Sequence, residues 1–456
     1  MVAPAVGPEK FTVVSLFSGA MGLDLGLERT GRFATLAVVE VDPAACETIR
    51  INHRKGLLAS PKLRVYQEDI RKLDPYAVLA DLGLAPGEVD LLAGGPPCQT
   101  FSSAGKRGSI QDTRGSLIWE FLRFVNALRP KFFLMENVRG LMSAAIRHRP
   151  IKERPENGGP PLEPDEEPGS VLRLFLQDID EEYRLDIFEV NAVNYGAPQL
   201  RERVLFIGNR FNVRVDLPPP THVSPWEYEE LARENPLFPP SVRPWRTLRD
   251  ALAGLQETDP VLLDFSPRKK KYLELVPPGG NWRSLPPEVA KESMGKAFHA
   301  KGGRAGWWRR LSYDLPSPTL VTLPNHASTA LCHPEHTRAL TLREYARIQE
   351  FPDEWEFAGR PVEQYRQVGN AVPVRLGQVA GEAIAEALDL VYREGLRPLG
   401  GAHPRLRKVY LKAHVRTRRW YRQGEALLWQ EGQENEEARY SPARKVVEEE
   451  EVACEC

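Results

Sequence analysis

A β-branched run that leads through a glycine-rich turn into a helical pattern constrains the fold of this chain more than any other feature. Residues 12–17 read Thr-Val-Val-Ser-Leu-Phe, and residues 18–22 read Ser-Gly-Ala-Met-Gly. Leucines at positions 23, 25 and 27 then begin a helical stretch. Such a strand, turn and helix lets a ligand approach the backbone closely, near the positive end of a helix. The sequence therefore predicts an α/β protein with a ligand site at its first turn.

Two further apolar runs end in acids that suit a nucleoside. The first ends in Glu40, 21 positions after Gly19, a spacing typical of a carboxylate that binds ribose hydroxyls. The second precedes Asp69 and Ile70, which we expect to contact the amino group and the ring of adenine. A nicotinamide cofactor is the alternative, but the turn lacks the Gly-x-Gly-x-x-Gly spacing of that class and Cys98 would stay unexplained. S-adenosylmethionine fits the three segments better.

A rigidly presented cysteine and an acid follow two more apolar runs. Residues 91–93 lead into Gly94-Gly95-Pro96-Pro97-Cys98-Gln99, in which the glycines allow a tight turn and the prolines fix φ. A second run, residues 132–135, ends in Glu136, 38 positions after the cysteine. The carboxyl ends of parallel strands meet at one edge of a sheet, so we expect the two groups to converge on one ligand. A thiol paired with an acid suits attack on a pyrimidine ring, whereas either residue alone would indicate a core cysteine or a solvated acid.

Five blocks in this order resemble the cytosine-C5 DNA methyltransferase family of bacterial restriction-modification systems, over most of residues 11–395. The blocks are Phe17-Ser18-Gly19-Ala20-Met21-Gly22, residues 94–105, Glu136-Asn137-Val138, Gln199-Leu200-Arg201-Glu202-Arg203 and Gly369-Asn370-Ala371-Val372-Pro373. The resemblance implies a Rossmann-like S-adenosylmethionine-dependent methyltransferase domain with a smaller target-recognition domain, and S-adenosylhomocysteine as a product. Met21 departs from the pattern, because many relatives carry glycine there, and we expect a slightly less open cofactor turn.

The resemblance also implies roles for the reactive residues. The Cys98 thiolate adds to C6 of the target cytosine, which allows C5 to attack the methyl group. Glu136, as a protonated acid, donates a hydrogen bond to N3. Arg203 is expected to contact the base carbonyl O2, and Arg201 to hold a backbone phosphate or to buttress the acid. The alternative for both arginines is a salt-bridge ladder on the surface of a strand.

Further site residues come from the same blocks and segments. Those expected to bind the cofactor are Phe17, Gly19, Gly22, Glu40, Val41, Asp69, Ile70, Pro97, Asn370 and Val372. Residues 100–116 form a basic, glycine-containing stretch that suits a lid over an extruded base, although a plain flexible connection is the alternative. The DNA-binding residues expected in and beside it are Gln99, Ser102, Lys106, Arg107 and Arg114.

Changes in composition predict four units along the chain. They are a catalytic and cofactor-binding part (1–215), a target-recognition domain (216–336), a return segment that completes the catalytic domain (337–395) and a charged C-terminal extension (396–456). The proline- and acid-rich stretch 147–169 is expected to be a surface insertion with little fixed structure. Residues 405–422 hold eight Lys or Arg and no acid, and could either extend the DNA footprint or pair with the acidic tail that follows.

Overall composition limits the remaining choices. A 42% hydrophobic content and a net charge of −1 fit a globular protein whose polyanion site is a local patch. No secretion signal or membrane span is recognisable, so we expect a cytoplasmic protein. We also expect a monomer. The five cysteines include no Cys-x-x-Cys, and Cys332, His333 and His336 lack a second cluster, so no metal is expected.

The expected partners are double-stranded DNA and a cognate restriction endonuclease acting on the same site. An RNA cytosine-C5 methyltransferase is the alternative enzyme. A catalytically silent, sequence-specific DNA-binding regulator is an alternative of another class, but it predicts a damaged reactive pair, and Cys98, Glu136 and Arg203 are all present.

Overall fold

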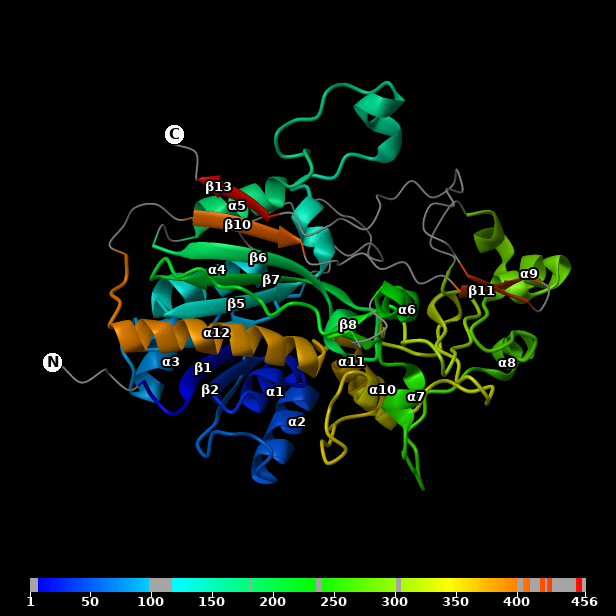
Figure 1. The fold of residues 1–456 in the computed structure, drawn as a ribbon, viewed down its shortest axis with the longest axis horizontal. Helices are drawn as coiled ribbons and strands as arrows, with labels where there is room; N and C mark the ends of the chain where they lie inside the picture. Colours follow the sequence, from blue (N-terminus) through cyan, green and yellow to red (C-terminus); the bar gives the residue numbers. More distant parts are fainter. Residues whose placement is uncertain are drawn as a thin grey trace.

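A twisted mixed β-sheet forms the centre of the larger part of the molecule (Figure 1). The computed structural model describes residues 7–97, 117–179, 182–234, 240–300 and 305–399, together with the backbone of four later strands. Within this part, the sheet has the order β13-β10-β6-β7-β5-β4-β1-β2-β3. Its strands are β1 (Phe11–Leu16), β2 (Phe33–Glu40), β3 (Arg64–Gln67), β4 (Leu91–Gly94), β5 (Phe132–Asn137), β6 (Arg184–Asn191), β7 (Glu202–Asn209), β10 (Arg405–Tyr410) and β13 (Glu448–Val452).

The strands that carry the predicted reactive groups are parallel, as expected from their order in the sequence. β1 pairs in parallel with β2 and β4, and β4 pairs in parallel with β5. Strand β7 runs antiparallel between β5 and β6, with Asn137 opposite Val204. The start of β7 therefore lies beside the carboxyl end of β5. This arrangement brings two parts of the site to the same sheet edge.

Helices cover both faces of the sheet, and each face has its own apolar core (Figure 1). On one face lie α1 (Gly22–Arg29) and the long α12 (Val374–Glu394); on the other lie α3 (Pro75–Leu82), α4 (Leu117–Leu128) and α5 (Ser170–Asp178). α2 (Pro43–Arg54) follows β2 and is capped by Asp42, whose carboxylate accepts the backbone N–H groups of Ala44 and Ala45. The prediction of an α/β class is confirmed.

Helices α1 and α12 cross at unusually close range because glycines lie at the crossing. A Cβ added at Gly26 would be 2.2 Å from the Val374 carbonyl oxygen, and one at Gly377 would be 2.3 Å from the Leu23 carbonyl oxygen. No larger residue fits there without separating the helices. The last long helix is thus held against the first, and the chain finishes the domain that it began.

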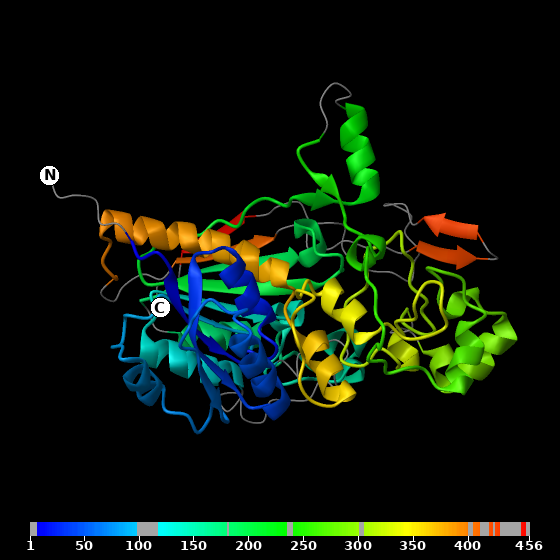
Figure 2. The same ribbon diagram turned by 90° about the horizontal axis from the view of Figure 1, so that it is seen from below.

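A second unit lies beyond the carboxyl ends of the strands (Figures 1 and 2). Its elements are β8 (His222–Val223), α6 (Pro225–Glu234), β9 (Arg243–Pro244), α7 (Leu248–Leu252), α8 (Pro267–Leu273) and α9 (Pro287–Met294). Phe265, Tyr272, Leu273 and Trp308 belong to an apolar core of its own. Figure 2 shows α6 projecting from the body of the molecule. The return segment supplies α10 (Leu342–Ile348) and α11 (Pro361–Asn370), and Thr341 and Glu344 form a capping box at the start of α10.

Short 3-10 helices connect these elements. They are η2 (Arg139–Ser143), η3 (Ile151–Glu153), η4 (Pro155–Asn157), η5 (Ala192–Tyr195), η6 (Trp282–Ser284), η7 (Gly295–His299) and η8 (Ala327–Thr329). The expectation of little fixed structure in 147–169 was wrong. The guanidinium of Arg149 donates to the carbonyls of Pro160 and Pro161 and pairs with Glu166, which closes the segment on itself.

The charged extension adds strands at two places. β10 pairs in parallel with β6, and β13 pairs antiparallel with β10, with Arg407 opposite Glu450 and Lys408 opposite Glu449. The backbone register therefore places a basic segment of the extension next to its acidic tail. A hairpin of β11 (Arg419–Arg422) and β12 (Glu425–Leu428) lies near η6 (Figure 1). None of the helices in the described ranges has the length and apolar character needed to cross a membrane.

Candidate active site

The glycine turn after β1 is fastened to the end of β2 by one carboxylate. Glu40 Oε2 accepts the backbone N–H of Gly19 at 2.8 Å, and Oε1 accepts those of Val41 and Asp42. Among the described residues, a Cβ on Gly19 would meet no atom within 4 Å, and Gly19 has a φ of +51°. The turn therefore faces open space, and Oε2 keeps a lone pair for a ligand hydroxyl. The predicted pairing of Gly19 with Glu40 is a direct contact.

An apolar surface and a second acid lie near this turn. Val41 is 63% exposed, which is unusual for a large aliphatic side chain beside a buried strand. Asp69 forms a two-pronged ion pair with Arg71, and this hydrogen bonding lowers the pKa of Asp69 to about 2. Ile70 is buried, with its carbonyl accepting from Arg123, so Val41 offers more apolar surface to an adenine ring than Ile70 does. These residues fit a nucleoside, because an apolar face and acceptors for ribose and amino groups are together.

Two residues of the turn adopt the left-handed region without being glycine. Phe17 has a φ of +56° and Met21 a φ of +64°. Left-handed φ in residues with a Cβ costs about 1–2 kcal/mol. The Met21 side chain is fully buried in the core with Leu25 and Val38, so the expectation of a less open cofactor turn was wrong.

The block at 369–373 closes against the first turn, as expected. A Cβ on Gly22 would be 2.3 Å from the carbonyl oxygen of Val372, so the two segments touch through their backbones. Asn370 is exposed at the end of α11, and Val372 is 8% exposed. Phe17, Gly19 and Gly22 therefore share one side of the predicted cofactor site with Asn370 and Val372.

The loop that leads to the predicted nucleophile lies against the end of β5. Asn137 Nδ2 donates to the Pro96 carbonyl at 3.2 Å, and a Cβ on Gly95 would be 3.1 Å from Glu136 Oε2. Pro97 is exposed. The described residues stop there, so the predicted nucleophile and the predicted DNA-binding residues lie outside them. These residues are Cys98, Gln99, Ser102, Lys106, Arg107 and Arg114.

The predicted acid and one predicted arginine form an ion pair. Arg203 Nε lies 2.5 Å from Glu136 Oε1, at an angle that is not that of a straight hydrogen bond. Both side chains are about nine-tenths buried, and Arg203 Nη1 also donates to the Glu202 carbonyl. Glu136 comes from the end of β5 and Arg203 from the start of β7. The surface-ladder alternative does not apply to Arg203, because its partner is buried.

Arg201 is buried and holds two other segments. Its Nη1 donates to the Leu320 carbonyl at 3.1 Å, and its Nη2 donates to the Gly369 carbonyl at 3.0 Å. Burial lowers the pKa of Arg201 well below its usual range, repulsion from Arg203 lowers it further, and Glu136 opposes the shift. Because Arg201 is 2% exposed and donates to carbonyls, the expected phosphate contact is wrong for this arrangement. The alternative of a buttress beside the acid agrees with its position.

A pair of buried glutamines continues this connection. Gln199 Nε2 donates to the side-chain oxygen of Gln349 at 2.8 Å, and Gln349 Nε2 donates to the carbonyls of Val368 and Ala371. Gln199 Oε1 also accepts the backbone N–H of Leu320. The segment that leads into β7, the end of α10 and the segment leaving the second unit are therefore joined by hydrogen bonds. The spacing of these residues in the sequence offered no signal of this network.

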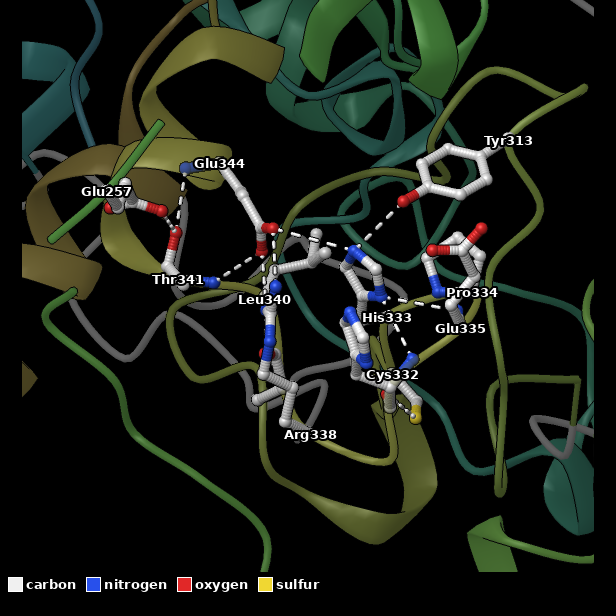
Figure 3. A network of polar contacts seen from close by, with 12 residues as sticks. Glu257, Tyr313, Cys332, His333, Pro334, Glu335, Arg338, Leu340, Thr341 and Glu344 are labelled. Atoms are coloured by element: carbon white, nitrogen blue, oxygen red, sulfur yellow. Dashed lines mark hydrogen bonds and ion pairs between the residues drawn. The ribbon is translucent and has the colours of Figure 1, made fainter. Parts of the chain in front are cut away.

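A second polar network joins the second unit to α10 (Figure 3). Arg338 forms two hydrogen bonds with the carboxylate of Glu344, and His333 Nε2 lies 3.2 Å from the Tyr313 hydroxyl. His333 Nδ1 accepts the N–H groups of Glu335 and His336, so the other ring nitrogen carries the proton. Burial lowers the pKa of His333 to about 4. No group of three metal-ligating side chains occurs among the residues that the structure describes.

Sequence reasoning missed one acid beside the cofactor turn. Asp24 lies in the first turn of α1 and is 1% exposed. An acid among the leucines at the start of an otherwise apolar helix was the signal that could have identified it.

Comparison with known proteins agrees with this geometry. Residues 11–386 match the C-5 cytosine-specific DNA methylase family. The chain is 38% identical to the Type II methyltransferase M.Sau96I of Staphylococcus aureus, over 83% of this chain and 76% of that protein. It is 40% identical to the Type II methyltransferase M.PspPI of Psychrobacter sp. (strain TA137), over 84% of this chain and 82% of that protein.

Among solved structures, a prophage-encoded E. coli protein described as a DNA modification methyltransferase aligns with a TM-score of 0.53 and 26% identity. The alignment covers 83% of this chain and all of that chain. The chain therefore belongs to the C-5 cytosine-specific DNA methylase family and is a DNA (cytosine-5-)-methyltransferase.

Proposed function

We propose that this enzyme methylates C5 of one cytosine within a specific double-stranded DNA sequence, through base flipping and a covalent bond between Cys98 and C6. The observation that carries the proposal is the buried pair of Glu136 and Arg203, placed against the Gly95-Pro96 loop that leads to Cys98. A flipped base is read by hydrogen bonds to its edge, and this pair offers an acid and a planar cation for that edge.

The protein groups act in a defined order. Glu136 takes up a proton when the base enters and replaces part of its pairing with Arg203. The Cys98 sulfur then forms a bond to C6 while Glu136 gives this proton to N3, so the electron pair of the C5–C6 double bond becomes available at C5. Arg203 stabilises negative charge at O2. After C5 has gained the methyl group, a water molecule takes the C5 proton, the C5–C6 double bond is restored and the thiolate leaves C6. Glu136 then recovers its proton from N3, and the enzyme is ready for another turnover.

S-adenosylmethionine is the donor that this site fits. When bound, it supplies an electrophilic methyl group and leaves as S-adenosylhomocysteine. We assign its ribose to Glu40 Oε2 and its adenine to the exposed face of Val41, with Asp69 as acceptor for the amino group after Arg71 rotates aside. Phe17, Gly19, Gly22, Pro97, Asn370 and Val372 would complete the wall. Their grouping around the open turn supports this assignment.

The same proposal assigns a separate role to each unit of the chain. Residues 1–215 with 337–395 would form the catalytic domain, and 216–336 the target-recognition domain, which has an apolar core of its own in support. Gln99, Ser102, Lys106, Arg107 and Arg114 would contact DNA from a lid over the flipped base. We expect the enzyme to act as a monomer on chromosomal DNA in the cytoplasm of a prokaryote, paired with a restriction endonuclease that cuts the same sequence.

A trapping experiment tests the covalent step. Duplex DNA that contains 5-fluorocytosine at the methylated position cannot lose its C5 substituent as a proton, so the adduct with Cys98 should persist. We expect an adduct with the wild-type enzyme and none with Cys98→Ser. Methyl transfer by the wild type without any trapped adduct would contradict the proposal. Structured RNA that contains cytosine, offered under the same conditions, tests the alternative substrate, because methylation of RNA but not DNA would reverse the assignment.

A further inference from the structure

Glu350 follows the end of α10, and three arginines meet at this one residue. Its side chain is 7% exposed. Oε1 lies 3.3 Å from Arg246 Nη1 and 3.5 Å from Arg375 Nη2, and Oε2 accepts the backbone N–H of Arg375 at 3.2 Å. The Glu350 carbonyl accepts from Arg29 Nη2 at 2.6 Å. The mechanism above uses none of these four residues, which we call the Glu350 junction.

The arginines of the Glu350 junction come from three different elements. Arg29 is the last residue of α1, Arg375 lies in the first turn of α12, and Arg246 lies between β9 and α7 of the second unit. Figures 1 and 2 show that α12 begins where the second unit meets the part that contains the sheet. Arg246 Nη1 also donates to the carbonyl of Gly196, just before β7. Arg246 therefore ties the base of the second unit to the catalytic domain, and Glu350 is its charged partner.

Positive charge exceeds negative charge at the Glu350 junction. Within the described ranges, Arg246 and Arg375 both form their ion pair with Glu350. Burial raises the pKa of Glu350, and the charges of Arg375, Arg246 and Arg29 oppose this shift. Without the carboxylate, Arg246 and Arg375 would repel each other across the boundary between the units. The acid therefore holds together two like charges that belong to different units.

The backbone of Glu350 is strained where it carries this carboxylate. Its φ is +67°, in the left-handed region that glycine adopts freely and a residue with a Cβ does not. Strain of this kind persists only where the surrounding contacts determine the conformation, and it is concentrated at functional positions. Glycine would fit this backbone better than glutamate, so we infer that the carboxylate itself is needed at position 350.

Glu350 also holds the helix that follows the predicted cofactor wall. Its Oε2 binds the backbone of Arg375, and the carbonyl of the preceding Gln349 accepts the N–H of Val374 at 3.1 Å. α12 therefore begins against this segment, two residues after Val372. One carboxylate thus contacts the second unit through Oε1 and the start of α12 through Oε2.

We propose that Glu350 is a positioning residue that fixes the second unit against the catalytic domain in the orientation that accepts duplex DNA. It acts through Arg246, so loss of either partner lets the base of the second unit shift. DNA binding is then weakened, while the chemical step on bound DNA is unchanged. The inference rests on the proposed function in one respect, namely that residues 216–336 contact DNA.

DNA binding by charge-neutral variants tests the proposal. Fluorescence anisotropy gives the dissociation constant of a labelled duplex that contains the sequence methylated in expressing cells, with S-adenosylhomocysteine present so that no transfer occurs. Glu350→Gln and Arg246→Gln should each raise this constant by about fivefold or more, at the lower end of couplings between linked sites. The glutamine amide offers one oxygen, so it cannot accept from both arginines.

Two comparisons show whether the effect belongs to this contact. The double variant Glu350→Gln with Arg246→Gln should bind DNA no more weakly than either single variant, because both changes break the same pair. Arg249→Gln is the matched control, since Arg249 pairs with Asp314 inside the second unit, and it should leave DNA affinity unchanged. Losses that add in the double variant, or an equal loss in the control, would contradict the proposal.

The sign of the Glu350→Gln effect separates positioning from direct phosphate binding. Removal of a negative charge strengthens DNA binding if the arginines contact phosphates, whereas positioning predicts weaker binding. Tighter binding by Glu350→Gln would therefore overturn the inference and assign the arginines to phosphates. The single-turnover rate of methyl transfer on saturating DNA should stay within about twofold of the wild type. A fall in this rate as large as the loss of affinity would also overturn it.

Two further variants separate positioning from folding. Glu350→Gly relieves the left-handed backbone, Glu350→Ala does not, and both lack the carboxylate. Glu350→Gly should therefore resist urea better than Glu350→Ala yet bind DNA as weakly. Recovery of DNA affinity in step with stability, or wild-type affinity in both Glu350→Gln and Arg246→Gln, would reject the inference alone. A wild type that binds a scrambled duplex as tightly as the methylated sequence would reject the proposed role of residues 216–336, and the inference with it.

Discussion

Arg203 Nε lies 2.5 Å from Glu136 Oε1, although the two residues come from strands that run in opposite directions. The insertion of β7 antiparallel to β5 is what makes this contact, because it brings the first residues of β7 to the carboxyl end of β5. The positive charge of Arg203 offsets the negative charge of Glu136, a residue that is only 8% exposed. The pair is thus available as a unit to the edge of a base.

Replacing the acid by its amide should abolish most of the chemistry while leaving the cofactor site intact. Glu136→Gln keeps the shape but cannot transfer a proton to N3, so kcat should fall by about 10²- to 10⁴-fold. Single-turnover methylation of duplex DNA measures this, and calorimetry checks cofactor affinity. Glu202→Gln is the matched control, because Glu202 pairs with Arg139 instead. An equal loss in both variants would show that the effect is not specific to position 136.

Removing the arginine should destabilise the fold as well as the activity. Arg203→Ala leaves Glu136 buried and without its partner, which typically costs about 3 kcal/mol. Urea unfolding monitored by tryptophan fluorescence measures this loss. Arg203→Lys restores the charge without the planar geometry, so it should recover stability more fully than methyl transfer. Equal recovery of both would mean that the planar geometry at O2 is unimportant.

Because α1 and α12 cross so closely, adding a single methyl group at the crossing should strongly lower the free energy of unfolding. Gly26→Ala would place Cβ 2.2 Å from a backbone oxygen, so the helices must separate, at a cost of about 2–3 kcal/mol, and the cofactor turn should shift. Gly381→Ala, on the same helix pair, would meet side chains of Thr30 and Leu27 at 3.0 Å or more and should be tolerated better. Thermal unfolding of both variants provides the comparison.

Asp24 predicts a pH dependence of stability in the cofactor-free enzyme. Its folded pKa, about 7, is raised from 3.8, so the stability that the protonated group contributes is complete below pH 3.8 and is lost as the pH rises to 7. The difference amounts to roughly 4 kcal/mol as an order of magnitude. Asp24→Asn should therefore gain stability relative to the wild type between pH 5 and pH 8. A pH-independent difference in unfolding free energy would contradict this assignment.

Much of the fold could be predicted because its signals are local. The turn from β1 into α1, the acid at the end of β2 and the parallel strands before Cys98 and Glu136 are each written in a short stretch of sequence. Predicting these elements required three local rules: apolar residues recur with the period of the element, glycine marks a turn, and the carboxyl ends of parallel strands converge.

The rest depended on contacts between distant residues, which no local pattern reveals. For Arg201 the sequence left a phosphate contact and a buttress of the acid both open, and its guanidinium donates to carbonyls 119 and 168 positions away. The bonds between Gln199 and Gln349 and the self-contained fold of 147–169 are of the same kind. The Met21 side chain was also misjudged, because its left-handed backbone turns the side chain into the core.

Bisulfite sequencing of DNA from cells that express the wild-type chain, in parallel with cells that express Cys98→Ser, tests the central claim most directly. We predict protected cytosines confined to one position within one short sequence in the first sample, and none in the second. Protection that is absent from the wild-type sample, scattered without a common sequence, or unchanged by the loss of the thiol would contradict the account.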